Sequence, residues 1–96
     1  MKNEQNMLKP IRVSEINPVY NDKGGVTEWG LTVTYCGQDG KPLHVGGARV
    51  SIIKNAEKHT LAEYRFPESV MERGFARAYT FRDALLKQIA RQNEER

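Results

Sequence analysis

The chain has 96 residues, 39% of them hydrophobic, which limits it to one small domain with a single core. Fifteen Lys and Arg against twelve Asp and Glu give a net charge of +3, which favours acidic partners but excludes the dense basicity of a protein that coats nucleic acid. The single cysteine cannot form an internal disulfide, and no apolar run is followed by a cleavage site, so we expect a cytoplasmic protein that is neither secreted nor inserted in a membrane.

The first part of the chain predicts an arm and a strand. Residues 1–9 are polar and lack periodicity, which predicts a flexible N-terminal arm in front of a single α+β domain over residues 10–96. Apolar residues recur within residues 11–20, and the polar, glycine-containing segment 21–25 is typical of a turn. We therefore expect a first strand over residues 11–20 that turns back into a second.

The clearest pattern in the chain follows this turn. Trp29, Leu31, Val33 and Tyr35 alternate with small or polar residues, which predicts a strand over residues 26–36.

A third strand is expected over residues 42–46. If Gly40 takes the left-handed position of a bulged turn, Tyr35 faces Leu43 and Val33 faces Val45, so that the large apolar side chains gather on one face. The three strands would then form an antiparallel meander with one apolar side.

The middle of the chain is less regular. Residues 48–54 fit a short fourth strand or a helical turn equally well, and this choice stays open. Thr60 and Glu63 have the spacing of a capping box, which predicts a short helix before Pro67. Pro67 in turn suits the first position of another short helix that stops at Gly74.

The principal helix is expected over residues 80–93. Thr80 can cap its start, and Phe81, Leu85 and Ile89 form an apolar stripe at helical spacing. This stripe can be buried only against the apolar face of the meander. The predicted fold is therefore α+β: a three-stranded antiparallel meander packed by a C-terminal amphipathic helix, with short irregular helices between them.

The sequence offers little catalytic chemistry. The expected hairpin places Cys36 and His44 on one polar face, where an imidazole could activate a thiol, but no residue is identifiable that would orient the histidine. Together with His59 these residues lack the close paired spacing of zinc ligands. We therefore predict no enzyme activity, no metal and no cofactor.

A binding surface is predicted instead in the irregular segment that precedes and enters the helix. Arginines and aromatic residues interleave there, and such residues can anchor a protein interface or grip phosphates and stack on bases. The predicted partner-binding residues are Tyr64, Arg65, Phe66, Pro67, Arg73, Arg77, Tyr79 and Arg82.

Two resemblances extend this interpretation. Three strands followed by a helix, with residues 29–40 entering a hairpin and residues 79–84 opening the helix, resemble the three-stranded DNA-binding modules of integrase arm-binding domains. That resemblance implies direct DNA or RNA binding through the sheet and the basic helix. The length, mild basicity and arginine-bearing helix resemble the small early accessory proteins of temperate enterobacterial phages, which include inhibitors or modifiers of host recombination nucleases. This second resemblance implies a non-enzymatic protein that docks on and modulates a nucleic-acid-processing complex. Either exposed edge of the sheet could also pair with a second copy of the chain.

Overall fold

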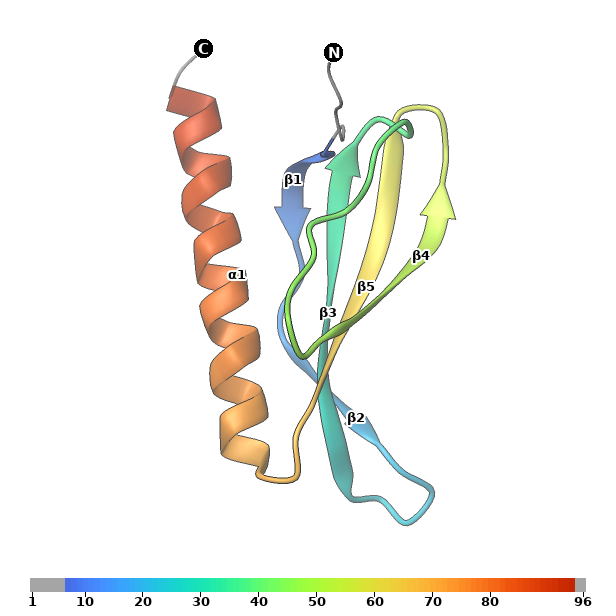
Figure 1. The fold of residues 1–96 in the computed structure, drawn as a ribbon, viewed down its shortest axis with the longest axis vertical. Coiled ribbons are helices and arrows are strands. Elements are labelled where there is room, and N and C mark those ends of the chain that lie inside the picture. The colour runs from blue at the N-terminus through green and yellow to red at the C-terminus, as the bar shows by residue number, and fades with distance from the viewer. Residues whose placement is uncertain (1–6, 95–96) are drawn as a thin grey trace.

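A computed structural model describes residues 7–94 of the chain, in which five strands form one antiparallel sheet and a single helix follows them (Figure 1). The elements are β1 (Lys9–Val13), β2 (Asn17–Tyr20), β3 (Val26–Cys36), β4 (Arg49–Asn55), β5 (His59–Pro67) and α1 (Met71–Glu94). The strand order is β1-β3-β5-β4, and β2 pairs with the first half of β3. The predicted α+β class, the antiparallel sheet and the C-terminal helix are confirmed.

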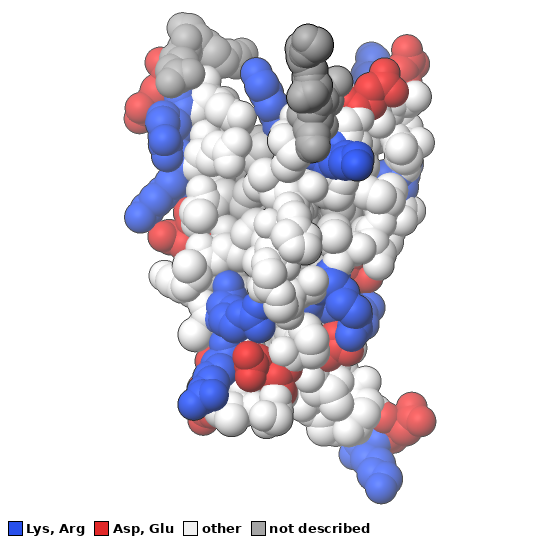
Figure 2. All heavy atoms as spheres, in the orientation of Figure 1, with Lys and Arg blue, Asp and Glu red and all other residues white. Residues whose placement is uncertain are grey.

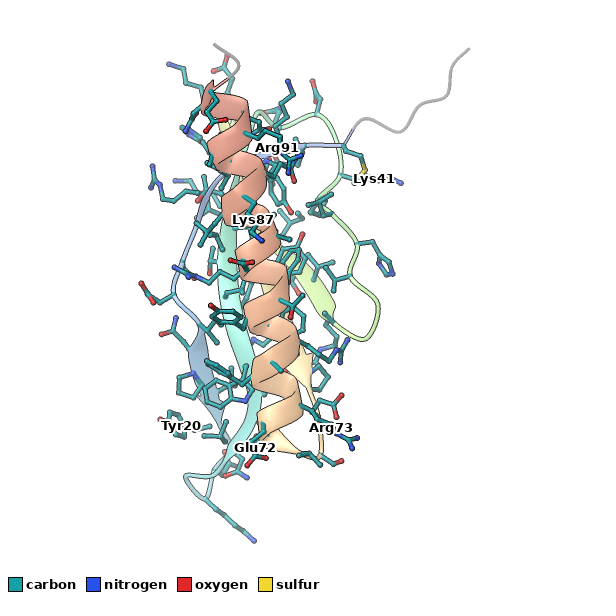
Figure 3. The ribbon with its side chains drawn as sticks, turned by 90° about the vertical axis from the view of Figure 1, so that its left-hand side faces the viewer. Tyr20, Lys41, Glu72, Arg73, Lys87 and Arg91 are labelled. Atoms are coloured by element: carbon teal, nitrogen blue, oxygen red, sulfur yellow. The ribbon has the colours of Figure 1, made fainter. Side chains whose placement is uncertain are left out.

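One face of the sheet is covered and carries the core. α1 lies along this face and contacts β1, β3 and β5 (Figures 1 and 3). Alternate residues of β3 and β5 point toward the helix, because successive side chains of a strand lie on opposite faces. The buried hydrophobic side chains are Leu8, Leu31, Val33, Tyr35, Ala62, Tyr64, Phe66, Ala78 and Leu85.

The expected third strand over residues 42–46 is wrong. β3 pairs along nearly its whole length with β5, so that Tyr35 faces Thr60 and Val33 faces Ala62. β5 offers nine residues with every second side chain buried, whereas the shorter segment begins at Pro42, which has no N–H to donate to a ladder. Residues 37–48 instead form a loop that folds back over the helix-side face of the sheet, where Leu43 and Val45 still pack against the core.

Two buried tyrosines hold this loop in place. The Leu43 N–H donates to the Tyr35 hydroxyl (3.2 Å), and the Tyr64 hydroxyl donates to the Leu43 carbonyl (2.7 Å). Since each hydroxyl has one proton, the 2.5 Å contact between the two hydroxyls is donated by Tyr35. The result is a closed ring of three hydrogen bonds. Burial is the main reason why the pKa of both phenols is raised above the ordinary value.

The irregular middle segment is mostly strand. The open choice over residues 48–54 is decided as strand β4, and the two expected short helices are wrong. Thr60 does not cap a helix but lies buried in β5, where its hydroxyl donates to the Gly37 carbonyl (2.7 Å). Pro67 ends β5, and the peptide bond before it is trans. The alternation of Thr60, Ala62, Tyr64 and Phe66 has the period of a strand, and pairing with β3 outweighs the local capping pattern.

α1 begins nine residues earlier than expected, at Met71 instead of residue 80. Gly74 is not a stop but a buried interior residue of α1 at a close contact with the sheet. A Cβ atom there would lie 3.1 Å from Trp29 Cδ1 and 3.3 Å from the Phe66 carbonyl oxygen. Thr80 likewise lies inside the helix and caps nothing. The expected apolar stripe is present, with Leu85 fully buried.

The N-terminal prediction concerns residues that are only partly described. Residues 1–6 of the expected arm lie outside the described residues. Leu8, however, is 6% exposed and belongs to the core, and Lys9 begins β1. No part of α1 or of any other helical structure within residues 7–94 combines the length and the apolar character of a membrane-spanning segment.

Candidate functional site

The eight predicted partner-binding residues do not share one surface. Tyr64 and Phe66 are 0% exposed, and both rings pack against Phe81, with centroids 4.7 and 5.9 Å apart. They alternate toward α1 in β5 and belong to the core. Neither side chain can anchor a partner on the folded protein, which corrects the prediction for these two residues.

The residues next to them point the other way. Arg65 lies on the sheet face opposite α1 and forms an ion pair with Glu63 (3.2 Å). Pro67 is half-buried at the end of the same strand. Arg65 therefore faces away from the predicted residues on the helix.

Arg77 and Arg73 lie on the flank of α1 that faces the loop of residues 37–48. Arg77 is held in place: its guanidinium lies 5.8 Å from the Phe66 ring centroid, pairs with Glu68 (3.4 Å) and donates to the Gly46 carbonyl. Arg73 is exposed in the first turn of the helix (Figure 3). The contacts of Arg77 are those of a structural residue that ties the helix to the loop.

Tyr79 and Arg82 lie on the opposite flank of α1, toward the connection between β1 and β2. Arg82 Nε donates to the Ser14 carbonyl (2.7 Å), and its guanidinium lies 3.7 Å from the Glu15 carboxylate. Tyr79 is 57% exposed. These two of the eight predicted residues border a surface that the sequence interpretation did not identify.

This surface is an aromatic groove between α1 and the β1–β2 edge of the sheet. Its residues are Ile16, Trp29, Met71, Phe75 and Tyr79. Two adjoining hollows of about 400 and 190 Å³ share Phe75 as a common wall. Phe75 is 42% exposed although it stands between these hollows.

The aromatic residues of the groove are held in a defined arrangement. Trp29 Nε1 donates to the Met71 carbonyl (3.0 Å), which attaches the indole to the first turn of α1. Phe75 meets the indole edge-on with ring centroids 5.1 Å apart and an interplanar angle of 76°, and Tyr79 follows Phe75 at 6.4 Å. The edge-to-face contact between Trp29 and Phe75 is of a kind that is favourable beyond the area that it buries.

The charges around the groove nearly cancel. Arg82 and Glu15 pair across one of its hollows, while Glu72 borders the other. The groove itself therefore has no excess of positive charge. The face seen in Figure 2, on the side of the loop of residues 37–48, has an uncharged central area with Lys, Arg, Asp and Glu around it.

The candidate catalytic pair is not assembled as expected. The shared face of Cys36 and His44 depended on the strand over residues 42–46, which does not form. The register places His59 opposite Cys36 instead, on the sheet face away from α1. Within residues 7–94, no three His, Cys, Asp or Glu side chains are grouped in a way that could hold a metal ion.

The two edges of the sheet differ in how open they are. All seven residues of β4 are exposed, among them Val50, Ile52 and Ile53. The opposite edge is divided between the short strands β1 and β2, and each of these contains a proline. Prolines and short strands hinder pairing with another chain, so β4 is the edge at which a second copy could add.

No family model, curated protein or solved structure matches this chain.

Proposed function

We propose that this protein is a non-enzymatic binding protein and that it docks on a protein partner through the aromatic groove. The observation that carries the proposal is the exposure of Phe75 and Tyr79 beside a Trp29 held by its hydrogen bond to α1. Aromatic residues dominate the binding energy of protein interfaces, because they bury a large area while few rotatable bonds are immobilised.

The charge of the groove favours a protein over nucleic acid as its occupant. Glu15 offsets Arg82, and Glu72 adds a negative charge that would repel a phosphate backbone. The complementary surface has aliphatic or aromatic side chains at its centre and a Lys or Arg placed to meet Glu72.

We propose that the partner is a cytoplasmic complex that processes nucleic acid, such as a host recombination nuclease, and that docking modulates the activity of this complex. The support for this class of partner is the resemblance in length, mild basicity and arginine-bearing helix to early accessory proteins of phages.

The test compares capture by matched variants. Tagged wild-type protein, Phe75→Ala/Tyr79→Ala and the control Leu86→Ala are used to capture proteins from nuclease-treated bacterial lysate, which is read by mass spectrometry. Leu86 is a suitable control because it lies on the same helix and is 41% exposed. Urea denaturation of each variant checks that the fold is intact, which is expected because all three side chains are exposed.

A stoichiometric partner that the wild type and Leu86→Ala retain and that the double variant loses supports docking at the groove. Equal capture by all three proteins, or equal loss in both variants, would contradict docking at the aromatic groove. If capture of the partner depends on the groove but the partner does not handle nucleic acid, docking at the groove stands and the proposed class of partner is wrong.

A second copy of the chain is an alternative occupant. Light scattering of the purified protein measures its mass directly. A dimer that the double variant abolishes would assign the groove to self-association and contradict the proposal, whereas a dimer that persists in this variant agrees with pairing at the β4 edge.

A further inference from the structure

The sheet face opposite α1 carries an ordered row of side chains. The strand registers place Arg12 of β1 opposite Thr34, Thr34 opposite Leu61, and Leu61 opposite Lys54 of β4. These four residues cross the whole sheet in one line, with a cation at each end. At about 4.8 Å per strand spacing, the two ends lie roughly 14 Å apart at the backbone.

The next row toward the end of β3 adds to this positive charge. Lys9 lies opposite Cys36, and Cys36 lies opposite His59. Neither row contains a carboxylate. The turn between β4 and β5 is neutral, because Glu57 is followed there by Lys58.

The remaining charges on this face neutralise one another. Arg65 pairs with Glu63 (3.2 Å), and Arg49 pairs with Glu28 (2.8 Å). The positive charge of this face is therefore concentrated in Lys9, Arg12 and Lys54 of these two rows. No single segment of the sequence reveals this concentration, because Lys9 and Arg12 lie in β1 and Lys54 lies in β4.

The row borders a hollow of about 200 Å³, which we call the basic hollow. It is lined by Arg12, Thr34, Lys54, Ala56, His59 and Leu61. Arg12 and Lys54 line the same hollow from opposite edges of the sheet, with Thr34 and Leu61 between them. The Thr34 hydroxyl and the His59 imidazole add hydrogen-bond donors to the two cations.

We propose that the basic hollow binds a phosphate group and that this sheet face contacts the backbone of a nucleic acid. Several cations and neutral donors that converge without a carboxylate are the chemistry of phosphate recognition. Among residues 7–94, the side chains that line the hollow include no Phe, Tyr or Trp on which a base could stack, so backbone contact rather than base recognition is expected. The hollow lies on the face opposite α1, and it is independent of the aromatic groove.

The test measures binding of a labelled single-stranded DNA oligonucleotide and of the duplex of the same sequence by fluorescence anisotropy at several salt concentrations. Arg12→Gln/Lys54→Gln is compared with the control Lys23→Gln/Arg73→Gln. Both variants lose two exposed positive charges and therefore have the same net charge. The control differs only in location, because Lys23 lies in the hairpin turn between β2 and β3 and Arg73 lies on α1. A parallel titration with inorganic phosphate follows the backbone amide signals of Thr34 and His59 by NMR.

For Arg12→Gln/Lys54→Gln we expect a loss of affinity of about tenfold or more and a salt dependence shallower by about 1.5 in the log–log slope. The control variant should lose much less, and Phe75→Ala/Tyr79→Ala should bind DNA like the wild type. Equal losses in the two charge variants, or no DNA binding by the wild type, would overturn the inference. A response of Thr34 and His59 to inorganic phosphate without DNA binding would overturn its assignment to nucleic acid.

Discussion

The hydrogen-bonded ring of Tyr35, Tyr64 and Leu43 allows a quantitative test of how the loop of residues 37–48 is held. Tyr64→Phe keeps the ring shape but removes the bond to the Leu43 carbonyl (2.7 Å) and the bond from Tyr35 (2.5 Å). Each lost bond costs about 1 kcal/mol, and the Leu43 carbonyl and the Tyr35 hydroxyl are left without their partners. We expect the free energy of unfolding to fall by about 2–4 kcal/mol.

The reciprocal variant, Tyr35→Phe, leaves the Leu43 N–H without its acceptor. The double variant removes both hydroxyls, so no hydroxyl of this pair is left buried without its partner. We therefore expect its loss to be smaller than the sum of the two single losses by about 1 kcal/mol, as is typical of residues in one network. Urea denaturation of the four proteins gives this coupling energy, and the exposed Tyr79→Phe is the control, with an expected change within about 0.5 kcal/mol.

Two results would refute this reasoning. If Tyr64→Phe is no more destabilising than Tyr79→Phe, the buried hydroxyl contributes nothing to stability. If the single losses add within error, the three groups do not act as one ring. Amide exchange at Leu43 gives an independent measure, since its protection should fall in Tyr35→Phe.

Three further predictions concern the core. Because burial raises the pKa of the two core tyrosines, their contribution to stability should be constant below about pH 10, where the unfolded chain also keeps these protons, and should fall above it by up to about 1.4 kcal/mol per pH unit for each tyrosine. Urea midpoints on both sides of this pH measure the fall, which should disappear when both residues are Phe. Leu85→Ala should cost about 2–5 kcal/mol of unfolding free energy, whereas the neighbouring Leu86→Ala should cost less than about 1, because Leu85 is 2% exposed and Leu86 is 41% exposed; equal thermal shifts would contradict the packing described. Gly74→Val should destabilise the protein by about 2 kcal/mol or more and change the fluorescence of Trp29, because the added atoms meet the indole; an unchanged spectrum and stability would show that the helix need not approach the sheet so closely.

The candidate site was predicted only in part from the sequence. Tyr79 and Arg82 border the aromatic groove, but Trp29 and Phe75 were not recognised as part of a surface. The helix was expected to begin near residue 80, so Phe75 and Tyr79 did not appear as neighbours one turn apart. Had Gly74 been interpreted as a close contact within a longer helix, this spacing would have been visible.

Local patterns alone determined several features of this protein. The alternation in residues 26–36 identified β3 with its correct bounds, and the apolar stripe identified a C-terminal helix, because both patterns depend only on the geometry of one element. The α+β class follows from these two elements together.

Only the tertiary structure decided which elements pair and which side chains stay exposed. Residues 42–46 and 59–67 both offered apolar residues to β3, and the longer ladder of β5 formed because it satisfies more backbone groups and buries more side chains. The pairing of β5 with β3 turned Tyr64 and Phe66 inward. The packing of α1 on the sheet left Phe75 and Tyr79 at the surface. The strand pairing also aligned Arg12 with Lys54 across four strands. Exposure and cross-strand alignment depend on contacts between residues far apart in the chain, and no local pattern encodes them.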